Sequence, residues 1–167
     1  TLLFSVAKEN GTLERLAKLI IYKSGGRKEL IPVIFFLLSI VLASIGPGNI
    51  STSALLMPIA ITIAFQTGIS ILLISGVVIL GSIGGGLSPL APNGIVALDL
   101  AEKAGVGSLG NYIYFNNVFA VTVFTIIMYF VLGGLKHRGE KVEVSKPEKF
   151  NRLQKYTLIG ILTLVIW

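Results

Sequence analysis

The sequence lacks charge over most of its length. No Asp, Glu, Lys or Arg occurs between Glu29 and Asp99, a run of 69 residues. About 20 apolar residues are enough to cross a bilayer, so this run is predicted to enter the membrane more than once. Charged residues make up 13% of the chain and hydrophobic residues 53%, whereas a soluble domain has about a quarter of its residues charged. The composition therefore indicates an integral membrane protein.

Residue types that carry most catalysis are also scarce. Cysteine is absent and the single histidine is His137, which excludes disulfides and thiolate metal sites. Residues 30–98 contain no histidine, aspartate, glutamate or lysine, so the apolar region has no acid or base to activate a nucleophile. We therefore expect no enzymatic activity and no organic cofactor.

The charges that are present form two basic clusters beside the apolar region. Residues 8–29 hold six Lys or Arg and three acidic residues, and residues 136–155 hold seven and three. Basic loops next to membrane spans are typical of the cytoplasmic side. Both clusters are predicted to be cytoplasmic loops of a multi-pass protein in a bacterial-type plasma membrane. The net charge of +6 then reflects topology, and no nucleic-acid partner is expected.

The two ends of the chain are predicted to be parts of membrane spans. Residues 1–29 are interpreted as the end of one span followed by an amphipathic helix over 12–23, which lies in the interface plane. Residues 136–155 are interpreted as a cytoplasmic linker, and residues 156–167 as the start of another span. Because apolar segments stand at both ends, we expect the chain to be a piece of a longer protein.

A first polar interruption, GPGNISTS at 46–53, separates apolar arms of about 12 to 16 residues. Such arms would be roughly 18 to 24 Å long, less than the roughly 30 Å hydrocarbon core. The lengths favour a re-entrant helical hairpin over residues 30–65, with its tip near the middle of the membrane. Two short spanning helices with an external loop are the alternative.

A second interruption, GGGLSPLAPNG at 84–94, lies inside another apolar region. Its three glycines and two prolines do not continue a regular helix, so a discontinuous transmembrane helix is predicted over 68–104. Unwound backbone at this depth is tolerated only where it is buried or lines a cavity. With a continuous span over 111–135, the sequence predicts an all-α transporter half over residues 30–135.

Helix ends that meet inside a membrane can bind ions without charged side chains. Helix N-termini suit anions, helix C-termini and unwound carbonyls suit a cation such as Na⁺, and discontinuous helices of transporters use both. The candidate binding residues are Gly48, Asn49, Ser51, Thr52, Ser53, Gly84, Gly85, Gly86, Ser88, Pro92 and Asn93. The candidate Na⁺ ligands among them are Asn49, Ser51, Gly85 and Asn93. A plain turn and a packing kink are the alternatives for the two interruptions.

GNISTSALLMPIA followed by SIGGGLSPLAPNG resembles the first-repeat signature of the ion transporter superfamily. It is similar to divalent-anion/sodium symporters and more so to bacterial malonate or dicarboxylate carriers, over roughly residues 1–135. The resemblance implies an elevator-type, homodimeric secondary transporter whose inverted second repeat completes the anion site. The best-known branch carries Ser-Asn-Thr at the tip, where this sequence has Gly48-Asn49-Ile50. Asn49 thus carries over and two hydroxyls do not.

The resulting functional hypothesis is sodium-coupled symport of a small di- or tricarboxylate anion. Its expected partners are that anion, Na⁺ as the coupling ion, the lipid bilayer and a second repeat of the same protein. A channel or pore with re-entrant loops is the alternative from another class. Within the superfamily, proton-coupled transport and arsenite-type export are further alternatives.

Overall fold

The computed structural model describes residues 6–7, 9–12, 15, 18–19, 22, 25–45, 48–136, 138–141 and 149–166. Its α-helices, in chain order, are α3 (Ile31–Ile45), α4 (Gly48–Thr67), α5 (Ile71–Gly86), α6 (Pro92–Lys103), α7 (Gly110–Val131) and α8 (Arg152–Ile166). Three helical segments are long and apolar enough to cross a membrane, namely Lys28–Ile45, Gly48–Thr67 and Gly107–Val131. The predicted all-α membrane fold is confirmed.

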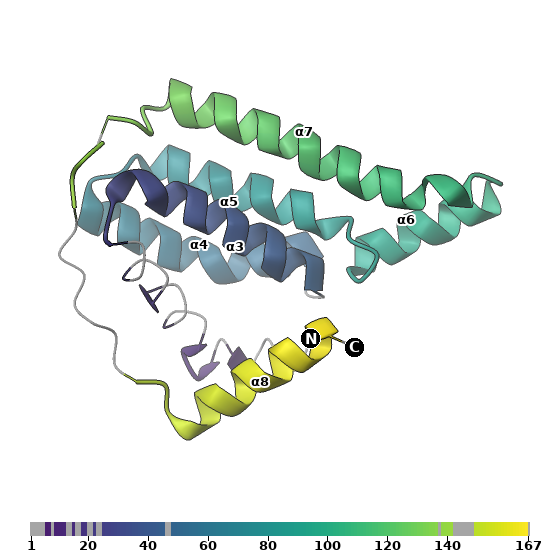
Figure 1. Cartoon of the computed structure of the whole chain (residues 1–167), viewed down its shortest axis with the longest axis horizontal. Helices are drawn as coiled ribbons and strands as arrows, with labels where there is room; N and C mark the ends of the chain where they lie inside the picture. The colour runs from purple at the N-terminus through teal and green to yellow at the C-terminus, as the bar shows by residue number, and fades with distance from the viewer. Residues whose placement is uncertain are drawn as a thin grey trace.

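Helix α5 is the central element, packed against α3, α4 and α7 (Figure 1). Two glycines one turn apart bring it very close to α3. A Cβ atom on Gly81 would lie 2.6 Å from the carbonyl oxygen of Phe36, and one on Gly85 would collide with the carbonyl oxygen of Ile40. Small residues at such positions let membrane helices approach at backbone distance and gain van der Waals contact. The glycines therefore fix where α5 lies along α3.

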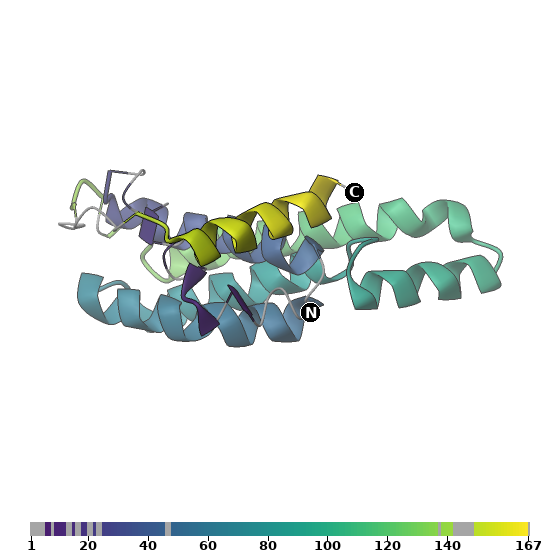
Figure 2. The same cartoon turned by 90° about the horizontal axis from the view of Figure 1, so that it is seen from below.

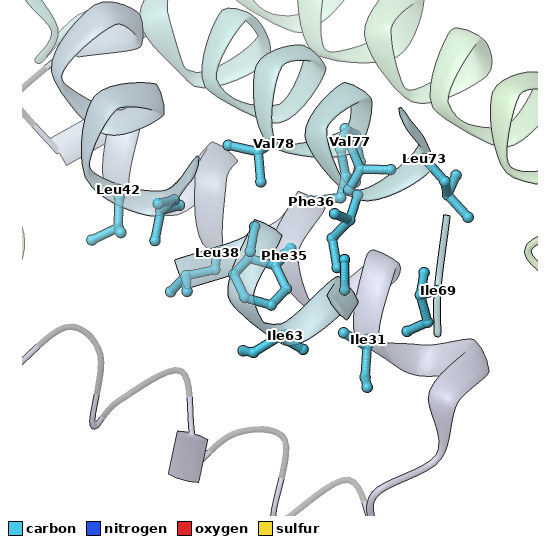
Figure 3. Close-up of a cluster of buried hydrophobic side chains, with 14 of the residues drawn as sticks. Ile31, Phe35, Phe36, Leu38, Leu42, Ile63, Ile69, Leu73, Val77 and Val78 are labelled. Atoms are coloured by element: carbon cyan, nitrogen blue, oxygen red, sulfur yellow. The ribbon is translucent and has the colours of Figure 1, made fainter. Parts of the chain in front are cut away.

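Large apolar side chains fill the space between α3, α4 and α5. Phe35 of α3 and Val78 of α5 are fully buried, and Ile63 of α4 is 8% exposed; Figure 3 shows them in one cluster. Because lipid is as apolar as these side chains, their close packing rather than water exclusion holds the helices together. The cluster joins the two arms of the hairpin through α5.

The hairpin arms differ from the sequence prediction. Helix α4 has 20 residues and begins at Gly48, so the polar residues 48–53 form its first turns, and Pro58 lies inside it. The prediction that each arm is too short to cross is wrong, because α4 and the Lys28–Ile45 segment are both long enough. In a membrane the backbone must satisfy its own hydrogen bonds, which keeps Asn, Ser and Thr helical here. Gly46 and Pro47 lie outside the described residues.

The break in the second apolar region is shorter than the interval 84–94. Gly84–Gly86 form the last turn of α5, and Pro92 is the first residue of α6. Proline is well accepted at that position because the first helical N–H has no partner within the helix. The irregular segment is therefore 87–91. Figure 2 shows α6 extending beyond the end of the hairpin formed by α3 and α4.

Helix α7 runs antiparallel along both halves of the broken helix. Its beginning contacts α6, where a Cβ on Gly110 would collide with the Leu98 side chain. Its end contacts the beginning of α5, where the Met128 side chain lies against Gly76. One long helix thus spans the full length of the broken pair.

The two basic loops lie at the same end of the bundle. Arg27 forms an isolated β-bridge with Lys141, and the Lys28 ammonium pairs with the Glu140 carboxylate at 2.7 Å. The Tyr129 hydroxyl, near the end of α7, donates to the carbonyl oxygen of Glu29 at 2.9 Å. The two charge clusters, which the sequence predicts to lie on one side of the membrane, thus contact each other at one end of the bundle.

Asn10, near the beginning of the chain, is hydrogen-bonded to α8, near its end. The Asn10 amide donates to the Thr157 hydroxyl of α8 at 2.9 Å, and the Gln154 amide donates to the Asn10 carbonyl at 2.8 Å. Of the interfacial helix predicted over 12–23, the structure describes Thr12, Arg15, Lys18, Leu19 and Tyr22 as helical. Most of its apolar face lies outside the described residues.

The glycine contact predicts a clear difference between two Gly→Ala substitutions in α5. Gly81→Ala is expected to lower the stability by about 1–3 kcal/mol, because the new methyl group would press on the α3 backbone. Gly76→Ala is the matched control, since its methyl group meets only the flexible end of Met128. Thermal unfolding midpoints of the two purified variants test this. Equal midpoints would contradict the close α3–α5 contact.

Candidate functional site

The beginning of α4 and the beginning of α6 meet at the end of α5. A Cβ on Gly86 would lie 3.1 Å from the Asn49 side chain, and one on Gly48 would lie 3.7 Å from the Pro92 ring. The amide Nδ2 of Asn93 donates to Oδ1 of Asn49 at 3.3 Å. The structure therefore brings together residues from both polar interruptions, 44 positions apart in sequence. We call these residues the junction: Gly48, Asn49, Gly86, Pro92 and Asn93.

The end of α3 reaches the same place. A Cβ on Gly85 would lie 2.9 Å from the backbone nitrogen of Ser44, and the Ser44 hydroxyl is 3.1 Å from the Tyr114 hydroxyl of α7. The junction thus joins two helix N-termini, of α4 and α6, with two helix C-termini, of α3 and α5. N-termini present N–H groups and partial positive charge, and C-termini present carbonyls and partial negative charge.

The depth of the junction can be measured along α7. Asn117 donates from Nδ2 to the carbonyl oxygens of Ile83 and Gly84, at 2.9 and 3.2 Å. Because α7 has 22 residues, Asn117 lies about 10 Å from its beginning and about 21 Å from its end at about 1.5 Å per residue. The end of α5 therefore lies well inside the length of a membrane-spanning helix.

Asn117 also satisfies carbonyls that α5 leaves without a partner. The last four carbonyls of a helix have no N–H from a following turn. The Asn117 amide donates to the carbonyls of Ile83 and Gly84. The backbone N–H of Ser88 donates to the carbonyl oxygen of Gly85 at 3.0 Å. These contacts give Asn117 a structural role at the end of α5.

The irregular segment 87–91 is organised by Ser88, which is buried. Its hydroxyl accepts the backbone N–H of Leu90 at 3.3 Å, and its carbonyl accepts the N–H of Ala91 at 2.9 Å. A Cβ on Gly94 would collide with the Ser88 carbonyl oxygen. The contacts of Ser88 thus stabilise the irregular segment between α5 and α6. They fix the direction of α6 relative to α5.

Two hydroxyls beside the junction connect α4 to α5, and a third has no partner. The hydroxyls of Ser53 and Ser82 are 2.7 Å apart, and Ser82 donates to the Ile79 carbonyl at 2.8 Å. Thr52 is 1% exposed, and its hydroxyl finds no hydrogen-bond partner in the described part of the chain. Since it lies three positions after Asn49, it faces the same side of α4. Thr52 therefore places a buried hydroxyl, without a partner in the described part of the chain, one turn along α4 from Asn49.

Among the predicted site residues of α4, Ser51 faces away from the junction. It is exposed and lies two positions after Asn49, and residues at that spacing face different sides of a helix. Asn49 and Ser51 therefore do not direct their side chains at one common ion.

Sequence reasoning missed Ser44, Ser82 and Tyr114. Each is a polar residue in a mostly apolar helix, and its partner lies on another helix, 70 positions away for Ser44 and Tyr114 and 29 positions away for Ser82. The residue type was the only signal in the sequence, and it does not specify the partner. The junction contains no charged side chain of its own, because residues 30–98 and 104–135 carry none.

A hairpin and a broken helix whose ends meet inside a bundle of apolar, membrane-length helices are the arrangement found in secondary transporters with discontinuous helices. The family comparison agrees: residues 1–86 match the family described as dicarboxylate carrier protein MatC N-terminus. Because the match takes in more than half of the chain, this protein belongs to that family. It is a dicarboxylate carrier and not an enzyme, and the resemblance drawn from the motifs is confirmed.

The matched region ends at Gly86, the last residue of α5. It therefore contains the whole hairpin and the first half of the broken helix, while the break, α6 and α7 follow it. Neither the curated proteins nor the solved structures gave a match.

The junction predicts that cysteines placed at Asn49 and Asn93 can be bridged. The natural chain has no cysteine, so Asn49→Cys/Asn93→Cys would carry the only two thiols. A short bis-maleimide is expected to join them, giving an intact mass increased by one reagent. The control pair, Asn49→Cys/Asp99→Cys, places the second thiol about 9 Å farther along α6 and should bind two reagents. Two reagents on both variants would show that the helix ends do not meet.

Proposed function

We propose that this protein is a sodium-coupled symporter of small dicarboxylates that binds both ions at the junction. The observation that carries the proposal is the meeting of two helix N-termini and two helix C-termini well inside the length of α7. Discontinuous helices at mid-membrane are how many secondary transporters bind anion and cation. A symporter needs the two ions side by side, and neighbouring helix ends of opposite polarity supply both kinds of ligand.

The cation ligands proposed are side-chain and backbone oxygens. Asn49 and Asn93 contribute amide oxygens. The last turn of α5 contributes the carbonyl of Gly86, which neither Asn117 nor Ser88 engages. The Thr52 hydroxyl, without a partner among the described residues, lies on the same face of α4 as Asn49. Hard cations prefer oxygen ligands, and neutral ones suffice for a single positive charge. Ser51 remains a sequence candidate but faces a different side of α4.

The anion is proposed to bind at the N-terminal turns of α4 and α6. The first N–H groups of a helix have no partner within it, and proline at position 92 leaves those of Asn93 and Gly94 as the first ones in α6. Asn93 is exposed, so this side of the junction is open. An inverted second repeat of the same fold would cover it and complete the site.

We also propose that the hairpin is re-entrant. The support comes from where its tip lies relative to α5, α6 and α7, and not from the length of its two arms. The tip contacts α5 at Gly86, beyond which α6 continues for 12 residues, or about 18 Å. If α7 marks the thickness of the membrane, the hairpin turns back before the far surface. The shared end of the bundle, with its basic loops, is then cytoplasmic by the positive-inside rule. Elevator-type movement and a homodimer are further parts of the proposal, and only the family resemblance supports them.

Sodium titration of transport tests the cation site. Asn49→Ala and Asn93→Ala are each expected to raise the half-saturating sodium concentration about tenfold, the effect of losing a polar contact of about 1.4 kcal/mol. Asn116→Ala is the matched control, because Asn116 is an exposed asparagine of α7 outside the junction. The assay measures uptake of labelled dicarboxylate into proteoliposomes, with choline replacing Na⁺.

Two results would contradict the proposal. An unchanged sodium dependence in both junction variants would remove the cation from this site. Uptake that persists undiminished when choline replaces Na⁺ would show that the carrier is coupled to another ion or is passive.

A further inference from the structure

A cavity of about 180 Å³ lies at the end of the bundle opposite the junction. It is bounded by the beginning of α3, the α4–α5 turn and the turn after α7. Its residues are Lys28, Pro32, Gly68, Ile69, Ser70, Leu73, Leu132, Gly133, Gly134 and Lys136. None of them belongs to the junction, so transport as described above does not use this cavity.

Two lysines from loops far apart in sequence give the cavity positive charge. Lys28 precedes α3 and Lys136 follows α7, 108 positions later, and both line it. The paired loops around them, residues 27–29 and 136–141, hold five Lys or Arg against Glu29 and Glu140. Lys28 is held in place by its ion pair with Glu140. The local field therefore favours an anionic occupant.

The beginning of α5 also lines the cavity, through Ser70 and Leu73. Ser70 caps this helix by accepting the backbone N–H of Leu73 at 3.4 Å, and the carbonyl of Ser70 accepts the N–H of Ile74 at 3.1 Å. The N–H groups of Ile71 and Leu72 have no acceptor within the helix, as at every helix N-terminus. They and the positive end of a 16-residue helix add to the two lysines.

The remaining wall of the cavity is apolar, and this favours a lipid over a free anion as the occupant. Pro32, Ile69, Leu73 and Leu132 line the same cavity as the lysines. The cavity lies at the end of membrane-length helices, where headgroups lie, and basic pockets between membrane helices bind anionic headgroups. A free phosphate would use only the polar half, whereas a phospholipid uses both.

We propose that this cavity binds the phosphate group of an anionic phospholipid, with Lys28 and Lys136 on the phosphate and the acyl chains leaving over the apolar wall. The lipid joins three parts of the fold at once: the beginning of α3, the turn into α5 and the turn after α7. It would thereby stabilise the end of the bundle that carries the basic loops.

Native mass spectrometry of the purified protein tests the proposal with two lipids of identical acyl chains. Phosphatidylglycerol adducts are expected to exceed phosphatidylcholine adducts. Lys136→Gln should lower the phosphatidylglycerol adduct about fivefold, as expected for one basic side chain near an anionic headgroup, and Lys28→Gln should act in the same direction. Lys136→Arg keeps the charge and should retain the lipid.

Arg138→Gln is the matched control, because Arg138 is an exposed basic residue of the same loop that does not line the cavity. An equal loss of lipid in Arg138→Gln and Lys136→Gln would overturn the proposal in favour of diffuse attraction to the basic loop. Equal binding of the two lipids would overturn it as well. Inorganic phosphate that raises the unfolding midpoint of the protein but not of Lys136→Gln, without a preference for phosphatidylglycerol, would assign the cavity to a free anion instead.

Discussion

The close contact between α5 and α3 is the constraint on which the arrangement of this protein depends. Gly81 and Gly85 allow the backbones to touch near the carbonyls of Phe36 and Ile40, and a larger residue at either position would push α5 away. Because the contact lies near the end of α5, it decides where that helix stops relative to the hairpin. Gly86 is thereby placed against Asn49, and the break after α5 opens beside the beginning of α4. The candidate site is a consequence of helix packing.

The same packing explains how a dicarboxylate carrier can have a binding region without charged side chains. Inside a membrane an isolated charge is costly, whereas the ends of helices carry partial charges and unpaired backbone groups as a matter of geometry. Four such ends meet at the junction, two of each polarity. The contacts of Asn117 and Ser88 with the surrounding backbone use up some of these groups, and the ones that remain are those available to ligands.

The sequence predicted the kind of fold, and the two polar segments that come into contact, better than the details of their packing. The 69-residue gap in charge and the two interruptions were sufficient to predict apolar helices, a hairpin and a break, because these follow from local composition. The helical state of residues 48–53 and of Gly84–Gly86 was not predictable, since Gly, Asn and Ser favour turns in water but remain helical in this packed, apolar setting. The pairs Asn49–Asn93 and Ser53–Ser82 depend on the register between helices, which no local pattern specifies. Ser51 was predicted from residue type, which does not specify the side of the helix that it faces.

The contacts between the two basic loops limit which movements this protein can make. Arg27 is bridged to Lys141, Lys28 is paired with Glu140, and Tyr129 reaches the Glu29 carbonyl, so the base of the hairpin is fastened to the base of α7. Swinging the hairpin open on its own would break all three attachments together. A displacement that keeps them intact would carry α3, α4, α5 and α7 as one rigid unit, with the proposed binding junction inside it.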